Sequence, residues 1–328
     1  MLTVTNMWPR PERPGFGTFV HSQVASLADH AVETEVHVIP GDRSAAAYFS
    51  ARRAISRAVR QWRPVLVHAH FGLSGWSVGH QQVPLVLSVC GDDLLGAVND
   101  AGTATLKSRV MTTMTRAAAR RAAAIICKSP NLRDALPEAL QSRAVVIPNG
   151  VDLRLFRPGS RHAARAQLGL DPTAEYVLFP HDHRQPVQKR FCLADAAMTR
   201  LRELRPHARL LHVSGEPAAR MPDYYRAANC LLLTSRSEGS PNTVKEALAS
   251  NIPVVSVDVG DVAQWLARCQ NCRLVDADAE ALALALNEIL ARDEPAGAEA
   301  VLADIDLAAV ARRIRAVYDH VLDGFVPA

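Results

Sequence analysis

Two glutamates, Glu238 and Glu246, stand eight positions apart with a Gly-Ser-Pro-Asn turn between them. The first follows an apolar run at 230–233, and the second lies in a predicted short helix that must end before Pro253. Carboxylates accept hydrogen bonds from hydroxyl groups, and the amides of a helix start favour an anion. The combination suits a ligand with vicinal hydroxyls and a phosphate, such as a nucleotide sugar. A helix-dipole acid plus a surface glutamate would account for the charges but not for the spacing.

A second cluster of charge follows the apolar run at 176–179. Arg184, Lys189 and Arg190 share this segment, where an arginine fork and a lysine point charge could clamp a diphosphate. A solvated basic loop explains the same residues equally well, so both interpretations stay open. The two histidines, His181 and His183, indicate metal less strongly because no partner set stands near them.

A pair of glycines, Gly15 and Gly17, lies between the apolar run at 2–5 and a helical pattern at 19–27. Glycines at a strand-to-helix turn let the backbone approach a phosphate. An ordinary tight turn explains two glycines as well.

Short apolar runs alternate with helix-forming segments along the whole chain. The runs are rich in Val, Ile and Leu, as in strands buried on both faces. They lie at 2–5, 35–39, 65–68, 85–89, 124–127, 144–147, 176–179, 209–213, 230–233, 254–257 and 272–275. Helical patterns such as 51–62, 106–123 and 279–291 separate them. The alternation predicts an α/β fold with doubly wound parallel sheets.

About eleven strands exceed one comfortable doubly wound sheet. Pro and Gly punctuation at 148–159 marks a break, after which a new strand pattern begins. The sequence therefore predicts two Rossmann-like domains, 1–152 and 153–306, that face a cleft. An amphipathic helix at 307–322 follows them.

Composition narrows the class of protein. A chain of 328 residues with 48% hydrophobic residues and a net charge of +4 fits a globular protein with an acidic ligand, and it lacks a nucleic-acid footprint. No secretory signal or spanning apolar run is evident, so we expect a cytoplasmic protein. Cys269 and Cys272 form the one close cysteine pair, and no second pair completes a zinc site.

The stretch from Glu238 to Ala247, followed by Ile-Pro-Val-Val at 252–255, resembles the EX7E motif of family 4 retaining glycosyltransferases. Further segments resemble that family in the same order along residues 1–270, and the overall look is nearest to its teichuronic-acid and exopolysaccharide members. These segments are the glycine loop at 9–20, Val-His-Ala-His at 67–70, Ile-Pro-Asn-Gly-Val-Asp at 147–152, Arg184 with Lys189, and Val-Gly-Asp at 259–261.

The resemblance implies a GT-B fold in which the first domain binds the acceptor and the second binds a nucleotide-diphosphate sugar. The helix at 307–322 would cross back to the first domain. The implied activity is retaining sugar transfer to an acceptor hydroxyl in glycan, glycolipid or glycosylated-metabolite biosynthesis, without a metal. On this basis neither Asp92-Asp93 nor Asp276-Ala277-Asp278 is a metal-binding motif, and surface or turn acids are expected there.

The resemblance also implies roles for individual residues. Arg184 and Lys189 would neutralise the leaving diphosphate, Glu246 would hold the ribose, and Glu238 would hold the transferred sugar. The remaining donor-binding residues implied by the family pattern are Gly15, Gly17, Gly239, Ser240, Pro241, Asn242 and Thr243.

One position departs from the family pattern. Cys90 stands where the family usually has a histidine that reaches the donor sugar or the acceptor, and a thiol is a weak hydrogen-bond donor. His70 or Asp92 would then compensate on the acceptor side of the cleft. The alternative is a catalytically impaired donor-binding or partner subunit. A dehydrogenase is disfavoured because no G-x-G-x-x-G follows the first strand.

The acceptor is the least defined partner. Helices at 52–63 and 109–121 carry many arginines and have apolar faces, which fits contact with an anionic membrane and a lipid-linked acceptor. A solvated basic face is the commoner explanation of such helices.

Overall fold

The computed structural model describes residues 1–40, 45–96, 103, 105–180 and 186–324. The chain divides into two compact units. The first comprises Met1–Arg10, Phe16–Gly150 and the segment from Leu307 on, and the second comprises Pro11–Gly15 and Val151–Asp306. The chain thus leaves the first unit at Gly150 and returns to it at Leu307.

The first unit contains a six-stranded sheet in the order β2-β1-β3-β4-β5-β6, and every pairing is parallel. Parallel strands need crossover helices on the faces of the sheet, so β1, β3, β4 and β5 are buried throughout. The strands are β1 (Leu2–Thr5), β2 (Glu35–Val38), β3 (Val67–His70), β4 (Leu85–Val89), β5 (Ala124–Cys127) and β6 (Ala144–Val146).

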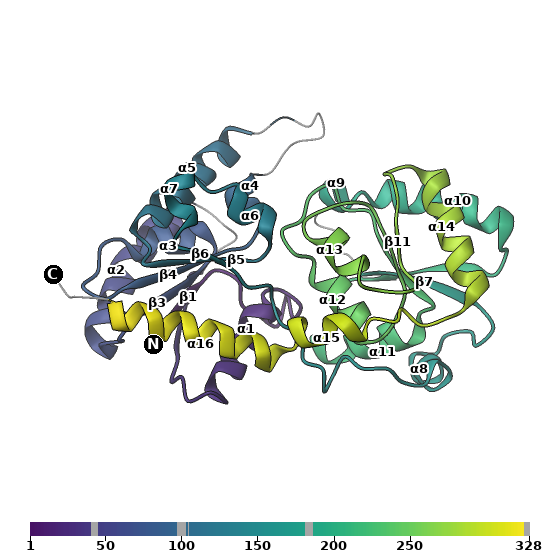
Figure 1. The fold of residues 1–328 in the computed structure, drawn as a ribbon, viewed down its shortest axis with the longest axis horizontal. Coiled ribbons are helices and arrows are strands. Elements are labelled where there is room, and N and C mark those ends of the chain that lie inside the picture. Colours follow the sequence, from purple (N-terminus) through teal and green to yellow (C-terminus); the bar gives the residue numbers. More distant parts are fainter. Residues whose placement is uncertain (41–44, 97–102, 104, 181–185, 325–328) are drawn as a thin grey trace. The chain divides into compact units, whose positions relative to one another are not determined.

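Helices cover both faces of this sheet (Figure 1). One apolar cluster joins the sheet to residues of α2, α3 and α5, and another joins it to α1 and α16. The helices are α1 (Thr18–Ala28), α2 (Ala45–Trp62), α3 (Gly72–Val78), α4 (Asp92–Leu95), α5 (Leu106–Arg121), α6 (Pro130–Asp134), α7 (Glu138–Gln141) and α16 (Leu307–Gly324). The last helix, drawn in yellow, buries the stripe of Val310, Ile314 and Val321 in this unit.

The second unit contains a five-stranded parallel sheet in the order β11-β10-β9-β7-β8. Its strands are β7 (Glu175–Pro180), β8 (Ala208–Val213), β9 (Cys230–Leu233), β10 (Val254–Ser256) and β11 (Arg273–Leu274). The chain goes from β7 outward to β8 and then returns to the other side of β7. The gap between β7 and β9 is therefore the topological switch point of this sheet, where ligands of such folds bind beyond the carboxyl ends of the strands.

The second unit also contains α8 (Arg161–Leu168), α9 (Pro186–Lys189), α10 (Phe191–Leu204), the 3-10 turn η1 (Ala218–Arg220), α11 (Met221–Ala227), α12 (Asn242–Ala249), α13 (Val262–Leu266), α14 (Ala279–Arg292) and α15 (Glu299–Ile305). One apolar core packs α10 to α15 on its sheet. The predicted doubly wound α/β class is confirmed for both units.

The strand pattern was predicted well, with one shift. The third strand occupies Val67–His70 rather than 65–68. Its end is therefore His70, and Val65 is 61% exposed ahead of it.

Candidate functional site

The segments that follow β7 and β9 meet at the switch point of the second sheet. Lys189 ends α9, and its Nζ lies 2.5 Å from Oε1 of Glu238, in the loop after β9. The two side chains are 23% and 14% exposed, so the ion pair is mostly shielded yet reachable from solvent. The structure thus brings together two residues that the sequence placed 49 positions apart.

A set of hydrogen bonds fixes the segment that carries Lys189. The Arg190 guanidinium donates to the carbonyls of Thr234 and Ser235 at 2.6 and 2.9 Å. In return the Thr234 hydroxyl donates to the Lys189 carbonyl at 2.8 Å. Arg190 therefore ties the two loops together. Its part in a diphosphate clamp stays a prediction.

Glu246 lies on the second turn of α12, partly exposed. The buried Tyr225 hydroxyl donates to its Oε2 at 2.7 Å. Burial raises the pKa of Glu246, while the Tyr225 hydrogen bond and the charge of Lys245 act in the opposite direction. The result is a carboxylate held in a fixed place beside a helix start.

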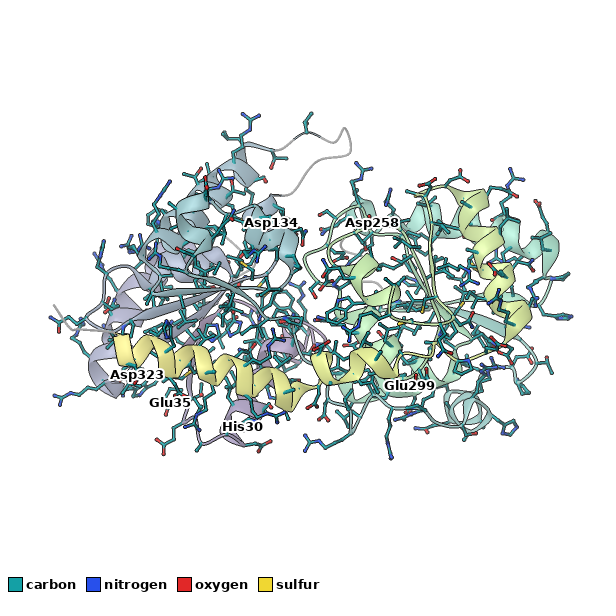
Figure 2. All side chains as sticks on the ribbon, viewed as in Figure 1. His30, Glu35, Asp134, Asp258, Glu299 and Asp323 are labelled. Atoms are coloured by element: carbon teal, nitrogen blue, oxygen red, sulfur yellow. The ribbon has the colours of Figure 1, made fainter. Side chains whose placement is uncertain are left out.

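The loop between the two glutamates packs tightly against the turn after β10. A Cβ on Gly260, where φ is +60°, would lie 2.6 Å from the carbonyl oxygen of Gly239 and 3.0 Å from that of Glu238. Only glycine fits there. The exposed Asp258, labelled in Figure 2, marks this turn. Ser240 and Pro241 are buried, whereas Asn242 and Thr243 at the start of α12 remain partly exposed.

Arg184, the predicted partner of Lys189, lies outside the described residues, as do His181 and His183. Its role therefore stays a prediction. Among the residues that the structure does describe, no three His, Cys, Asp or Glu side chains are grouped so that they could hold a metal ion.

The two glycines of the first loop differ in how much space surrounds them. Gly17 has φ of +76° before α1, and a Cβ there would lie 2.2 Å from the carbonyl carbon of Met7, so the turn itself requires glycine. A Cβ on Gly15 would make only an ordinary 3.8 Å contact with the Glu216 carbonyl oxygen. Gly15 groups with the second unit and Gly17 with the first.

In the first unit, β1 and β3 are adjacent at the corresponding switch point, and His70 ends β3. His70 is fully buried, and its Nε2 lies 3.3 Å from Nε2 of Gln23. Burial holds the pKa of His70 well below its usual value, so the imidazole is neutral at pH 7. Its neighbour His68 is hydrogen-bonded through Nδ1 to the Tyr318 hydroxyl at 2.6 Å.

Cys90 follows β4 and is partly exposed. Its backbone N–H and that of Gly91 donate to Oδ1 of Asp93 at 3.0 and 2.8 Å, and the Gly72 N–H donates to Oδ2 at 2.8 Å. Asp93 is completely buried, so the expectation of a surface acid is wrong for this residue. It fixes the loops after β3 and β4. Asp92 stays partly exposed.

Comparison with known families agrees with this geometry. Residues 5–155 match the model of Glycosyltransferase Family 4, and residues 183–292 match that of Glycosyl transferases group 1. Both units of the chain thus carry glycosyltransferase domains, and that of the first unit is of Glycosyltransferase Family 4.

Two curated relatives of the chain are glycosyltransferases. The D-inositol 3-phosphate glycosyltransferase of Segniliparus rotundus is 29% identical, with 66% of this chain and 56% of the relative covered. The putative teichuronic acid biosynthesis glycosyltransferase TuaC of Bacillus subtilis is 26% identical, with 69% of this chain and 61% of the relative covered. The chain thus spans little more than half the length of these relatives.

Solved structures show the same architecture. Sucrose-phosphate synthase from Thermosynechococcus elongatus has a TM-score of 0.78 at 18% identity, with 99% of both chains covered. HepE from Anabaena in complex with UDP-glucose has a TM-score of 0.69 at 17% identity, with 97% of this chain and 99% of that chain covered. At these identities the likeness concerns the fold, and it confirms the predicted GT-B fold.

The sequence analysis assigned no role to several residues that support this site. Tyr225, Lys245 and Asp261 all support the loop and helix that carry the two glutamates. One signal was available, because Lys245 is one of only four lysines in the chain and stands between apolar residues of a short helix.

The first unit holds a further unusual side chain. Lys128, directly after β5, is 1% exposed, and its Nζ has no hydrogen-bond partner among the residues that the structure describes. The register of Val89 with Cys127 makes Lys128 the neighbour of Cys90 at the ends of adjacent strands. Burial lowers the pKa of Lys128 to about 8, and the thiols of Cys90 and Cys127 oppose the shift.

Proposed function

We infer that this chain moves a sugar from a nucleotide-diphosphate sugar to an acceptor hydroxyl, with retention of the anomeric configuration and without a metal. The observation that carries the proposal is the meeting of Lys189 and Glu238 at the switch point of the second sheet, with Glu246 on the short helix that follows the Glu238 loop. A cation, two carboxylates and a helix start are the groups that a diphosphate and two sets of hydroxyls require.

In the proposed mechanism the second unit holds the donor and the first holds the acceptor. Glu246 accepts hydrogen bonds from the ribose hydroxyls, and Glu238 accepts them from the transferred sugar. Lys189, with Arg184, stabilises the charge that develops on the diphosphate as the glycosidic bond breaks. The acceptor oxygen forms the new bond on the same face, and its proton passes to the departing phosphate oxygen.

The relatives support one class of donor and one class of acceptor. HepE binds UDP-glucose, which supports a nucleotide-diphosphate sugar as donor. TuaC belongs to teichuronic acid biosynthesis, which supports a role in polysaccharide or glycolipid assembly. Base, sugar and acceptor are then matters for direct measurement.

A peripheral membrane contact fits the surface of the first unit. Basic residues of α5 flank exposed apolar side chains at its start, Leu106 at 78% and Val110 at 51% exposure. Within the described ranges, no helix has the length and hydropathy needed to cross a bilayer. We propose that the enzyme works at the inner face of the membrane, where a lipid-linked acceptor would meet it.

A thermal-shift panel with UDP, GDP, ADP and TDP and their sugars tests the donor site. A ligand at 100 times its Kd adds about 2.7 kcal/mol to the free energy of unfolding, so one base should raise Tm clearly. The shift should vanish in Glu246→Ala and persist in Glu175→Ala, which changes a glutamate at the start of β7, at the opposite edge of the same sheet. No shift with any nucleotide would contradict the proposal.

The alternative of a donor-binding subunit without turnover is motivated by Cys90. Product formation separates the two functions, because a binding subunit would show the nucleotide shift and no transfer. Cys90→His then reports on the site itself. A large gain in transfer marks a weakened enzyme, and a loss marks a site adapted to the thiol.

A further inference from the structure

Three polar side chains form a buried chain of hydrogen bonds at the loop of residues 238–242, here called the donor loop. Nζ of Lys245 donates to Oγ of Ser240 at 3.0 Å, and Oγ of Ser240 donates to Oδ2 of Asp261 at 2.7 Å. Lys245 is 0%, Ser240 8% and Asp261 3% exposed. A lysine from α12, a serine from the loop after β9 and an aspartate from the turn after β10 therefore meet inside the second unit.

Burying the charges of Lys245 and Asp261 costs folding free energy. Lys245 sits on α12 between Val244 and the buried residues Ala247 and Leu248, in the apolar core of the unit. Burial raises the pKa of Asp261, and the charge of Lys245 offsets part of that cost. Apolar side chains of similar size usually stabilise such a place at least as well as a buried ion pair does. Stability alone therefore does not explain the network.

What the network holds is the donor loop. Ser240 is the second residue after Glu238 and the second before α12 begins, so its hydroxyl is bound from both sides within the proposed donor-binding segment. On the adjacent side, Gly260 leaves no room for a Cβ against the carbonyls of Glu238 and Gly239. Hydrogen bonds with Lys245 and Asp261 therefore fix Ser240. Close packing against Gly260 fixes the two residues before it.

We propose that Lys245 and Asp261 are positioning residues that act through Ser240 to hold the loop at 238–242 in the shape that binds the donor diphosphate. The inference rests on the proposed function. The network acts by pre-organisation, since a loop already in its bound shape loses less conformational entropy when the ligand arrives.

Four variants test the network, with the Kd of the preferred nucleoside diphosphate and Tm as the two measurements. Lys245→Met and Asp261→Leu each remove one of two opposite buried charges, so both should lower Tm. Lys245→Met with Asp261→Leu removes the pair and should recover most of the Tm. Ser240→Ala keeps the charges and cuts their link to the loop. Glu175→Gln, which breaks the Glu175–Arg205 ion pair at the other edge of the sheet, is the matched control.

We expect the Kd to rise at least tenfold in the double variant despite its recovered Tm, about three- to tenfold in Ser240→Ala, and not at all in Glu175→Gln. A purely structural network would instead restore the wild-type Kd together with the Tm. A second measurement at pH 9 excludes an effect through the charge of Glu246, which Lys245 also influences. A positioning defect persists at that pH, whereas recovery of affinity there would overturn the inference.

The two proposals fail in different ways. A wild type that binds none of UDP, GDP, ADP and TDP overturns the proposed function and this inference with it. A wild type that binds one of them, with the same Kd in the double variant and in Ser240→Ala, overturns the inference alone.

Discussion

Lys189 and Glu238 form an ion pair with 2.5 Å between Nζ and Oε1, although the proposed mechanism gives them different parts of the donor to bind. Lys189 is to meet the diphosphate and Glu238 the sugar. In the structure Lys189 therefore lies against a carboxylate of the same site. On the proposed mechanism, the donor diphosphate would compete with that carboxylate for Lys189.

This exchange predicts opposite effects on binding and on transfer when Glu238 changes. Glu238→Gln keeps the size of the side chain and releases Lys189, so the Kd for the nucleoside diphosphate should fall several-fold. The kcat for sugar transfer should fall about 100-fold, because the sugar loses a charged hydrogen-bond acceptor. Isothermal titration and an initial-rate assay measure the two quantities. Weaker nucleotide binding in Glu238→Gln would show that the pair does not compete with the ligand.

Lys189→Ala serves as the companion variant. It should weaken nucleotide binding and lower kcat by about 100- to 1,000-fold, as expected when one stabiliser of developing negative charge is removed. Lys107→Ala, an exposed lysine of α5, should leave nucleotide binding unchanged.

The hydrogen bond from Tyr225 to Glu246 should influence how donor binding depends on pH. Burial raises the pKa of Glu246, so the fraction of its charged form, and with it the affinity for the ribose, falls as the pH drops through that raised value. Tyr225→Phe removes a hydrogen bond that favours the charged form, so the fall should begin at a higher pH. At pH 7 the Kd should rise about tenfold.

The control for this prediction is Tyr176→Phe, a buried tyrosine at the start of β7, which should leave the pH profile unchanged. Nucleotide Kd values between pH 5 and 8 provide the measurement. Identical profiles for Tyr225→Phe and the wild type would separate Glu246 from the pH dependence of binding.

Most of the fold could be predicted because its information is local. Short runs of Val, Ile and Leu buried on both faces identify parallel strands, and the Pro-Asn-Gly segment after β6 marks where the first unit ends. The order of the strands, and hence the switch point that brings Lys189 to Glu238, depends on contacts between distant segments. No pattern within either segment contains that order.

The supporting residues of the site were harder to predict for a related reason. Asp93 resembles a turn acid in the sequence, and only its three backbone partners from two loops show it as a buried anchor. Lys245 and Asp261 are ordinary surface types until the fold places both inside one core. Residue type reveals the groups that meet a ligand more readily than those that hold them in place.

The proposed membrane contact can be tested with a surface variant that should lose binding to anionic liposomes. Leu106 and Val110 are one helical turn apart at the start of α5 and are mostly exposed. Leu106→Asp with Val110→Asp should abolish flotation with liposomes that contain an anionic lipid, because both apolar insertion and charge attraction weaken. Leu284→Asp, on the exposed face of α14, should float as the wild type does. Equal flotation of the wild type with neutral and anionic liposomes would contradict the charge component, and no flotation at all would remove the membrane contact.

The buried charge of Lys128 should lower the stability of the folded protein. The Lys128 pKa of about 8 lies below the 10.5 of an ordinary lysine, so the unfolded chain binds more protons between these values and stability rises with pH across that window. Below about pH 8 the buried charge carries its full cost, which the shift sets at about 3 kcal/mol. Lys128→Met should therefore raise the free energy of unfolding at pH 7, and the gain should fade as the pH approaches 10.5. Denaturant unfolding at both pH values measures it, with Lys107→Met as the exposed control.

Sugar transfer by the same variant tests why the lysine is kept. Lys128 adjoins Cys90 at the carboxyl edge of the first sheet, in the unit proposed to bind the acceptor. A natural chain retains a destabilising charge where activity needs it, so Lys128→Met should transfer sugar more slowly while it unfolds less readily. The nucleotide Kd should stay unchanged, because the proposed donor site lies in the second unit. A variant that is less stable than the wild type at pH 7 would instead show that the ammonium group has a stabilising partner.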